Sequence, residues 1–139
     1  MSMKLEHIGI AVTSIERHLE VWRDIFGFVV GEMTEVTGQK VKVVMLDVGG
    51  VHVELIEPLG QDSPIHKFIE KRGEGLHHLS FEVKDLKEMI EELKKRGVRM
   101  IDDVPRSGAH GSVVTFVHPS STGGVLIELS QEGAVEQEV

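Results

Sequence analysis

The stretch LEHIGIAV at residues 5–12 decides the fold, because the chain repeats its pattern as LHHLSFEV at residues 76–83. A second pair follows the same scheme, since GGVHVEL at residues 49–55 returns as GGVLIEL at residues 123–129. Each half of the chain therefore opens with a histidine on an apolar strand and closes with a glutamate on another. The duplication predicts two similar halves that pack about a pseudo-two-fold axis.

The segments between these strands follow one plan in both halves. Apolar spacing predicts a helix in each half, capped near Thr13 in the first and at Asp85 in the second. Further strands are expected at residues 28–35, 40–48, 51–57, 98–101, 112–117 and 125–129. A short connecting helix is expected to begin at Ser63 and Pro64 and to end by Gly73. The predicted fold class is therefore α+β, with tandem βαβββ modules, a mixed sheet curled into a cup and helices on the outer face.

Strand alternation predicts which way the repeated histidines and glutamates point. On their strands, His7 and His78 point to the face away from the bulky aliphatic side chains. Glu54 and Glu128 likewise point away from the aliphatic side chains of their own strands. His77 would point to the helix side, so His78 is the better counterpart of His7. The two imidazoles and two carboxylates would meet at one place. Such a set predicts a divalent-metal site in the cup, with coordination positions left for a chelating substrate.

Composition narrows the class of protein. The formal net charge of −8 disfavours nucleic acid as a partner. The absence of cysteine excludes disulfides, zinc-thiolate sites and thiol nucleophiles, and it suits a reducing cytoplasm. Neither a long apolar stretch nor a signal-peptide pattern is present, so we expect a cytoplasmic protein without a membrane span.

The chain length predicts one domain, residues 1–139. It would consist of repeat halves at residues 4–60 and 75–131, joined by the short helical connector, and residues 132–139 would form a loosely ordered tail. The segment Gly108-Ala109-His110-Gly111 has two interpretations. Its glycines would let the backbone approach a ligand closely, and they would equally suit an ordinary loop.

Several stretches together carry a family resemblance: HIGIAV at 7–12, VELIEPL at 53–59, DSPI at 62–65, GLHH at 75–78, GAHG at 108–111, HP at 118–119 and GVLIEL at 124–129. In this order they make the chain resemble the vicinal oxygen chelate superfamily, which includes glyoxalase I, extradiol dioxygenases and fosfomycin-resistance proteins. More narrowly, the chain is similar to the methylmalonyl-CoA epimerase family. The resemblance covers nearly the whole chain.

The resemblance implies a homodimer that interconverts (2R)- and (2S)-methylmalonyl-CoA with a divalent metal ion, often Co²⁺, with Mn²⁺, Ni²⁺, Zn²⁺ and Mg²⁺ as alternatives. The metal positions fall on His7, Glu54, His78 and Glu128, and the loop at residues 108–111 becomes a candidate substrate contact. Glu128 is expected to be the main catalytic base, with Glu54 or a bound water opposite. Some relatives carry glutamine at the position of Glu54 and an acid/base glutamate on the preceding strand, whereas residues 40–46 contain no carboxylate.

Two other functions stay open on the sequence alone. A glyoxalase I-like isomerase of a glutathione hemithioacetal would use the same four ligands, although the DSPI and GAHG stretches favour the epimerase. A non-enzymatic small-molecule-binding protein on the same fold can lose the ligands, whereas this chain has all four. An extradiol dioxygenase is less expected, because iron oxygenases prefer two histidines and one carboxylate.

Overall fold

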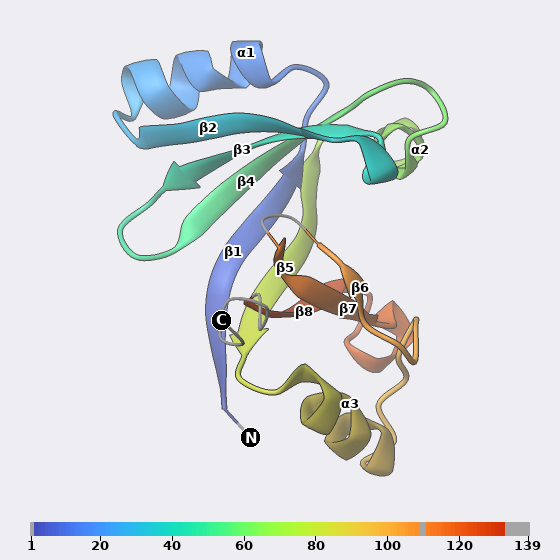
Figure 1. Cartoon of the computed structure of the whole chain (residues 1–139). Coiled ribbons are helices and arrows are strands. Elements are labelled where there is room, and N and C mark those ends of the chain that lie inside the picture. Colours follow the sequence, from blue (N-terminus) through green and yellow to red (C-terminus); the bar gives the residue numbers. More distant parts are fainter. Residues whose placement is uncertain (1, 109–110, 133–139) are drawn as a thin grey trace. The chain divides into compact units, whose positions relative to one another are not determined.

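The computed structural model describes residues 2–108 and 111–132 (Figure 1). The chain forms two compact units. The N-terminal unit runs from His7 to His77, and the C-terminal unit comprises the residues up to Glu6 together with those from His78 on. Each unit is described by itself below.

The N-terminal unit contains one β-α-β-β-β series and a following helix. Its elements are β1 (Met3–Ala11, of which the part from His7 belongs here), α1 (Ile15–Leu19), the π-helix η1 (Glu20–Ile25), β2 (Val29–Val36), the 3₁₀ turn η2 (Thr37–Gln39), β3 (Val41–Asp47), β4 (His52–Pro58) and α2 (Pro64–Arg72). The strand order is β2-β3-β4-β1. Strand β1 runs parallel to β4, and the other neighbours are antiparallel, so this part of the sheet is mixed.

The C-terminal unit repeats this connectivity. Its elements are β5 (Gly75–Val83, of which the part from His78 belongs here), α3 (Leu86–Lys95), β6 (Arg106–Ser107), β7 (Val113–Val117), the 3₁₀ turn η4 (Pro119–Ser121) and β8 (Ile127–Gln131). The strand order is β5-β8-β7-β6, with β5 parallel to β8 and the other pairs antiparallel. The predicted α+β fold of tandem βαβββ modules with mixed sheets is therefore confirmed.

One predicted strand is wrong. Residues 98–101 form only an isolated bridge, between Met100 and Val117, and the strand beside β7 on the side away from β8 is the two-residue β6. Pro105 stands directly before β6 and has no N–H to give to a ladder, which limits pairing in this segment.

Each unit packs one face of its sheet against its own helix. In the N-terminal unit, helix α1 and strands β3 and β4 bury a shared cluster: Val12, Ile15, Leu19, Val44, Leu46, Val53 and Leu55. In the C-terminal unit, α3 and the strands do the same with Val83, Leu86, Met89, Ile90, Leu93, Val117 and Leu129. Burying one such side chain contributes about 1.5–3 kcal/mol relative to leaving it exposed. The aliphatic faces of the repeated strands thus cover the helices, as predicted.

The opposite face of the N-terminal sheet is partly covered by the connecting helix. Helix α2 begins at Pro64 with Ser63 as its N-cap and ends at Arg72 with Gly73 as its C-cap, as predicted. Its Ile65 packs with Ala11 and Ile56, which lie on the same face of β1 and β4 as His7 and Glu54. This face therefore has an apolar end under α2 and a polar part that carries the candidate metal ligands.

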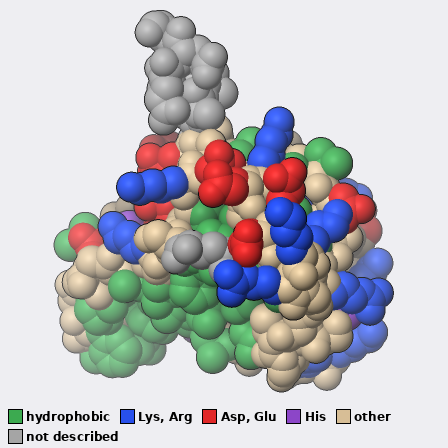
Figure 2. Space-filling view, turned by 90° about the horizontal axis from the view of Figure 1, so that it is seen from below, with side chains coloured by type: hydrophobic (Ala, Val, Ile, Leu, Met, Phe, Trp, Pro, Cys, Tyr) green, Lys and Arg blue, Asp and Glu red, His purple; other side chains and the backbone are tan. Residues whose placement is uncertain are grey.

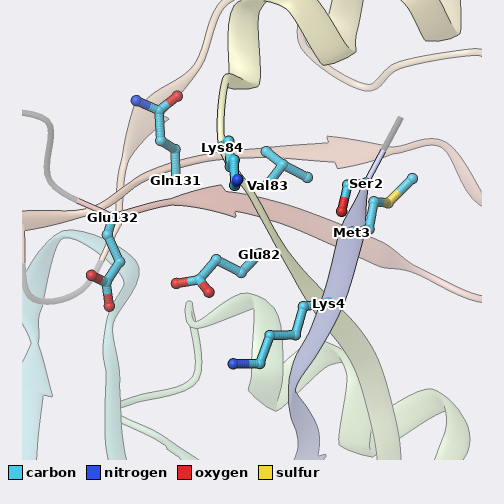
Figure 3. A pocket seen from close by; sticks show the side chains of 8 residues that line it. All are labelled: Ser2, Met3, Lys4, Glu82, Val83, Lys84, Gln131 and Glu132. Carbon is cyan, nitrogen blue, oxygen red and sulfur yellow. The ribbon is translucent and has the colours of Figure 1, made fainter.

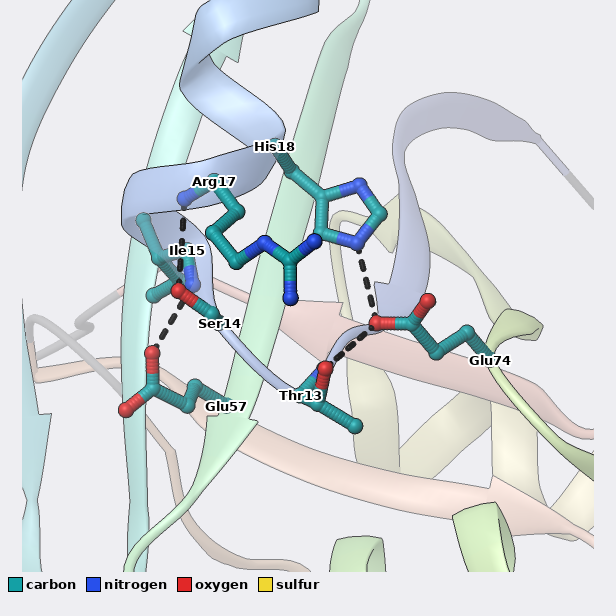
Figure 4. Close-up of polar contacts among 7 residues, drawn as sticks. All are labelled: Thr13, Ser14, Ile15, Arg17, His18, Glu57 and Glu74. Carbon is teal, nitrogen blue, oxygen red and sulfur yellow. Dashed lines mark hydrogen bonds and ion pairs between the residues drawn. The ribbon is translucent and has the colours of Figure 1, made fainter.

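Two carboxylates from distant segments hold the start of α1 (Figure 4). Glu57 accepts a hydrogen bond from the backbone N–H of Ile15 at 2.8 Å. Glu74 accepts from the N–H and the hydroxyl of Thr13 at 2.7 and 3.0 Å. The cap is Ser14, whose hydroxyl accepts from a backbone N–H at 3.2 Å. The expectation that Thr13 caps the helix is wrong, because Glu74 engages that side chain.

The charged side chains mix on the surface. Figure 2 shows Lys and Arg side chains interspersed with Asp and Glu, without a continuous basic area on the face it displays. Among the described residues, no helix combines the length and apolar character needed to cross a membrane.

Candidate metal centre

In the N-terminal unit, the parallel pairing of β1 and β4 brings a histidine beside a glutamate. Gly9 is in register with Glu54, and His7 lies two residues before Gly9 on the same face. The Nε2 atom of His7 is 3.4 Å from Oε1 of Glu54. Both residues are buried, at 7% and 9% exposure. The sequence therefore builds a buried pair of metal-ligating side chains on the face away from α1.

The C-terminal unit repeats this register residue by residue. Strand β5 runs parallel to β8, and Ser80 is in register with Glu128. His78 lies two residues before Ser80 on the same face and is 7% exposed, whereas Glu128 is half-buried. In both units, the register partner of the glutamate is the residue two positions after the histidine. The duplicated geometry inferred from the sequence is present inside each unit.

These residues supply the chemistry of a metal site. His7, Glu54 and His78 form a group of described residues that could together hold a metal ion. Imidazole nitrogens and carboxylate oxygens suit Co²⁺, Mn²⁺, Ni²⁺ and Zn²⁺ alike, so the donor set fits a divalent cation without selecting one. Glu128 is not a member of this group, and its role as a ligand stays a prediction.

His77, the neighbour of His78, has different surroundings. Its ring packs edge-on against Phe68 of α2, with 4.8 Å between the ring centroids. Burial lowers the pKa of the His77 imidazole, and the positive charge of Arg72 acts in the same direction, whereas Glu54 opposes them. His77 thus lies against the connecting helix α2 and not against α3, the helix of its own half. It is His78 that groups with His7 and Glu54 as a possible ligand.

The predicted substrate loop is only partly described. Gly108 donates its N–H to the carbonyl of Ser112 at 2.9 Å. A Cβ on Gly108 would lie 2.7 Å from Cγ1 of Val114, so the close approach requires glycine. Gly111 has a φ of 76°. Ala109 and His110 lie outside the described residues, and the substrate contact stays a prediction.

A pocket of about 370 Å³ lies in the C-terminal unit, away from these residues (Figure 3). Its wall includes two basic side chains, Lys4 and Lys84, and two acidic ones, Glu82 and Glu132. Because both positive and negative side chains line the pocket, its charge favours neither an anion nor a cation. The pocket contains none of the predicted ligands.

Sequence reasoning missed two residues that the structure makes prominent. Glu74 binds Thr13 across 61 residues of sequence, and such a long-range contact leaves no local signal. Ser80 shares a face of β5 with His78, and strand alternation alone gives it no role, yet it is fully buried. The repeat held a signal for it, because the matching position in the first half is Gly9, which has no side chain.

Comparison with known proteins gives the family. Residues 6–116 match the Glyoxalase/Bleomycin resistance protein/Dioxygenase superfamily, and the chain belongs to that superfamily. It is 39% identical to the mitochondrial methylmalonyl-CoA epimerase of Mus musculus, over 92% of this chain and 72% of that protein.

Solved structures agree with this assignment. The crystal structure of the hypothetical protein BH1468 from Bacillus halodurans C-125 matches with a TM-score of 0.92 and 46% identity, covering 95% of this chain and 96% of that one. A methylmalonyl-CoA epimerase in complex with methylmalonyl-CoA and NH4+ matches with a TM-score of 0.88 and 35% identity, covering 97% and 98%. The chain is thus a superfamily member related to the methylmalonyl-CoA epimerases.

Proposed function

We propose that the protein is a metal-dependent methylmalonyl-CoA epimerase, which interconverts the (2R) and (2S) forms of its substrate. The observation that carries the proposal is a repeated arrangement in a chain of this superfamily: each candidate histidine, His7 or His78, lies two residues before the register partner of a glutamate, Glu54 or Glu128. The relatives named as epimerases, and the solved complex of one of them with methylmalonyl-CoA, support the choice of substrate.

The proposed metal site draws one histidine and one glutamate from each unit. A divalent ion, with Co²⁺ as the first candidate, would be held by His7, Glu54, His78 and Glu128. When bound, it would act as a Lewis acid that stabilises negative charge developing on the substrate's oxygens. The buried His7–Glu54 pair supports the proposal, because both side chains offer metal-ligating atoms in a site shielded from solvent.

The residues would move a single proton. The hydrogen on C2 of the substrate is acidic because C2 lies between a thioester and a carboxylate. We assign its removal to a carboxylate oxygen of Glu128, which takes the proton while the C–H electron pair becomes a second bond between C2 and the thioester carbon. The π pair of the thioester carbonyl moves onto its oxygen, which gives an enolate. C2 is then planar, and a proton returns from Glu128 or, on the other face, from Glu54 or a water molecule. General acid/base assistance of this kind contributes about 10²–10⁴-fold in rate.

The decisive experiment follows hydrogen exchange at C2 in D₂O. Wild-type protein stripped of metal and reloaded with Co²⁺ should epimerise methylmalonyl-CoA and incorporate deuterium, and the stripped protein should not. Glu128→Gln should lose about 10²–10⁴-fold in exchange. Glu82→Gln is the matched control. Glu82 lies on the same face of β5 as Ser80, the register partner of Glu128, and has no part in the proposed reaction.

Three results would count against this function. Full epimerisation by the stripped protein would remove the metal from the reaction. Exchange retained by Glu128→Gln would move the base elsewhere. Turnover of the methylglyoxal–glutathione hemithioacetal, without epimerisation, would replace the proposal with the glyoxalase I-like alternative.

We also propose that the protein acts as a homodimer. Three large apolar side chains of the N-terminal unit are unusually exposed: Ile25 at 73%, Phe26 at 57% and Val29 at 70%. They lie on η1, on the turn that follows it and on β2, and β2 is the outermost strand in the order of this unit. An apolar area beside an outer strand suits a self-complementary contact between two copies.

A further inference from the structure

Ser80 carries a hydroxyl that is buried without a hydrogen-bond partner among the described residues. The residue is fully buried, on β5, which pairs with β8 in the C-terminal unit. A buried polar atom without a partner is destabilising, so natural proteins retain few of them and each calls for an explanation. Packing alone does not supply one, because alanine would fill nearly the same space without the unpaired hydroxyl.

The register of the strands shows what this hydroxyl can reach. Neighbouring strands lie about 4.8 Å apart, and residues in register point to the same face. Ser80 is in register with Glu128, whereas Glu82 lies two residues further along β5, about 6.6 Å away. Thr115 points to the other face, because its register partner Leu129 packs with the helix α3 cluster. Glu128 is therefore the acidic side chain in this unit best placed to accept from Ser80.

We propose that Ser80 is a positioning residue, whose hydroxyl donates a hydrogen bond to the carboxylate of Glu128 when the site holds a divalent metal ion. The inference rests on the proposed function, since it assigns a supporting partner to the proposed ligand and base. Ligating carboxylates are commonly held by such hydrogen bonds, and loss of one typically weakens metal affinity about 10–100-fold. The first repeat has Gly9 at this position, so the support belongs to Glu128 and not to Glu54.

The test compares metal affinity with the stability of the metal-free protein. Ser80→Ala should bind Co²⁺ about 10–100-fold more weakly than wild type and change the visible absorption of the bound ion. Its metal-free thermal stability should be equal or higher, because the substitution removes an unpaired hydroxyl. Ser80→Cys has a side chain of similar size with a weak S–H donor, so its Co²⁺ affinity should fall between those of wild type and Ser80→Ala.

Ser130→Ala is the matched control, because Ser130 lies on the same face of β8 two residues from Glu128 and should leave Co²⁺ affinity unchanged. Equal Co²⁺ affinity and an unchanged spectrum in Ser80→Ala would overturn the inference and leave the proposed function standing. A loss of metal-free stability in both Ser80 variants would assign the hydroxyl a structural role and overturn it as well. Wild-type protein that binds no Co²⁺ would overturn the metal site and this inference together.

Discussion

Replacing Glu74 by glutamine should loosen the start of α1 and make the N-terminal unit less stable. The carboxylate of Glu74 accepts hydrogen bonds from the N–H of Thr13 at 2.7 Å and from its hydroxyl at 3.0 Å. It also pairs with Nε2 of His18 at 2.9 Å (Figure 4). These donors lower the pKa of Glu74 from 4.5 to about 2, the backbone N–H of Thr13 contributing most. The amide of glutamine keeps one acceptor oxygen and loses the negative charge.

The pKa shift of Glu74 sets an upper limit on the unfolding free energy that Glu74→Gln can lose. A difference of this size between the folded and unfolded pKa corresponds to about 3.4 kcal/mol. The side chains of Glu74 and His18 are 38% and 33% exposed, so solvent screening reduces the expected loss to about 1 kcal/mol. Because the folded pKa is the lower one, the contribution is complete above pH 4.5. It disappears as the pH falls toward 2.

Chemical unfolding of wild type and Glu74→Gln between pH 7 and pH 3 measures this contribution. The difference in unfolding free energy should stay constant down to about pH 4.5 and then shrink. Glu70→Gln is the control, because Glu70 pairs with His66 at 3.4 Å on the surface of α2 and should cost little. Equal stability of Glu74→Gln and wild type at pH 7, or a difference that grows on acidification, would refute the reasoning.

Two further predictions concern the loop at Gly108 and the proposed dimer. Gly108→Ala should destabilise the protein by about 1–3 kcal/mol in chemical unfolding, since its Cβ would meet Val114, a stiff buried side chain. Gly38→Ala, where a Cβ meets nothing within 4 Å, should be tolerated, and similar losses in both would contradict the packing argument. Ile25→Lys should convert the proposed homodimer to monomers in light scattering, whereas Val104→Lys, equally exposed in the other unit, should not. A dimer retained by Ile25→Lys would place the contact elsewhere.

Local patterns were sufficient for most of the fold. Alternation along LEHIGIAV and LHHLSFEV assigned the correct faces, because a period of two leaves each residue only two choices. Helix α3 begins after Asp85, whose side chain caps it as expected. The candidate ligands followed from the same alternation combined with the repeat. Pairing of Gly9 with Glu54, and of Ser80 with Glu128, shows the two halves using one register.

Long-range contacts account for what the sequence did not predict. Thr13 and Ser14 are both good caps, and the choice between them depends on Glu74, which is far away in sequence. The π-helix η1 continues α1 to Ile25, but apolar spacing over six residues does not distinguish it from an α-helix. Ser80 became informative only through its burial and through the lack of a hydrogen-bond partner for its hydroxyl in the part of the chain that the structure describes.

The boundaries of the compact units have a consequence for dividing the molecule. Both boundaries cut through strands, between Glu6 and His7 in β1 and between His77 and His78 in β5. A gene segment that encodes only the second repeat would therefore omit the opening residues of the chain, which belong to the same unit. The boundaries of the two repeats in the sequence therefore differ from the boundaries of the two compact units. A circular permutation would need to keep residues up to Glu6 linked to the second repeat to leave that compact unit intact.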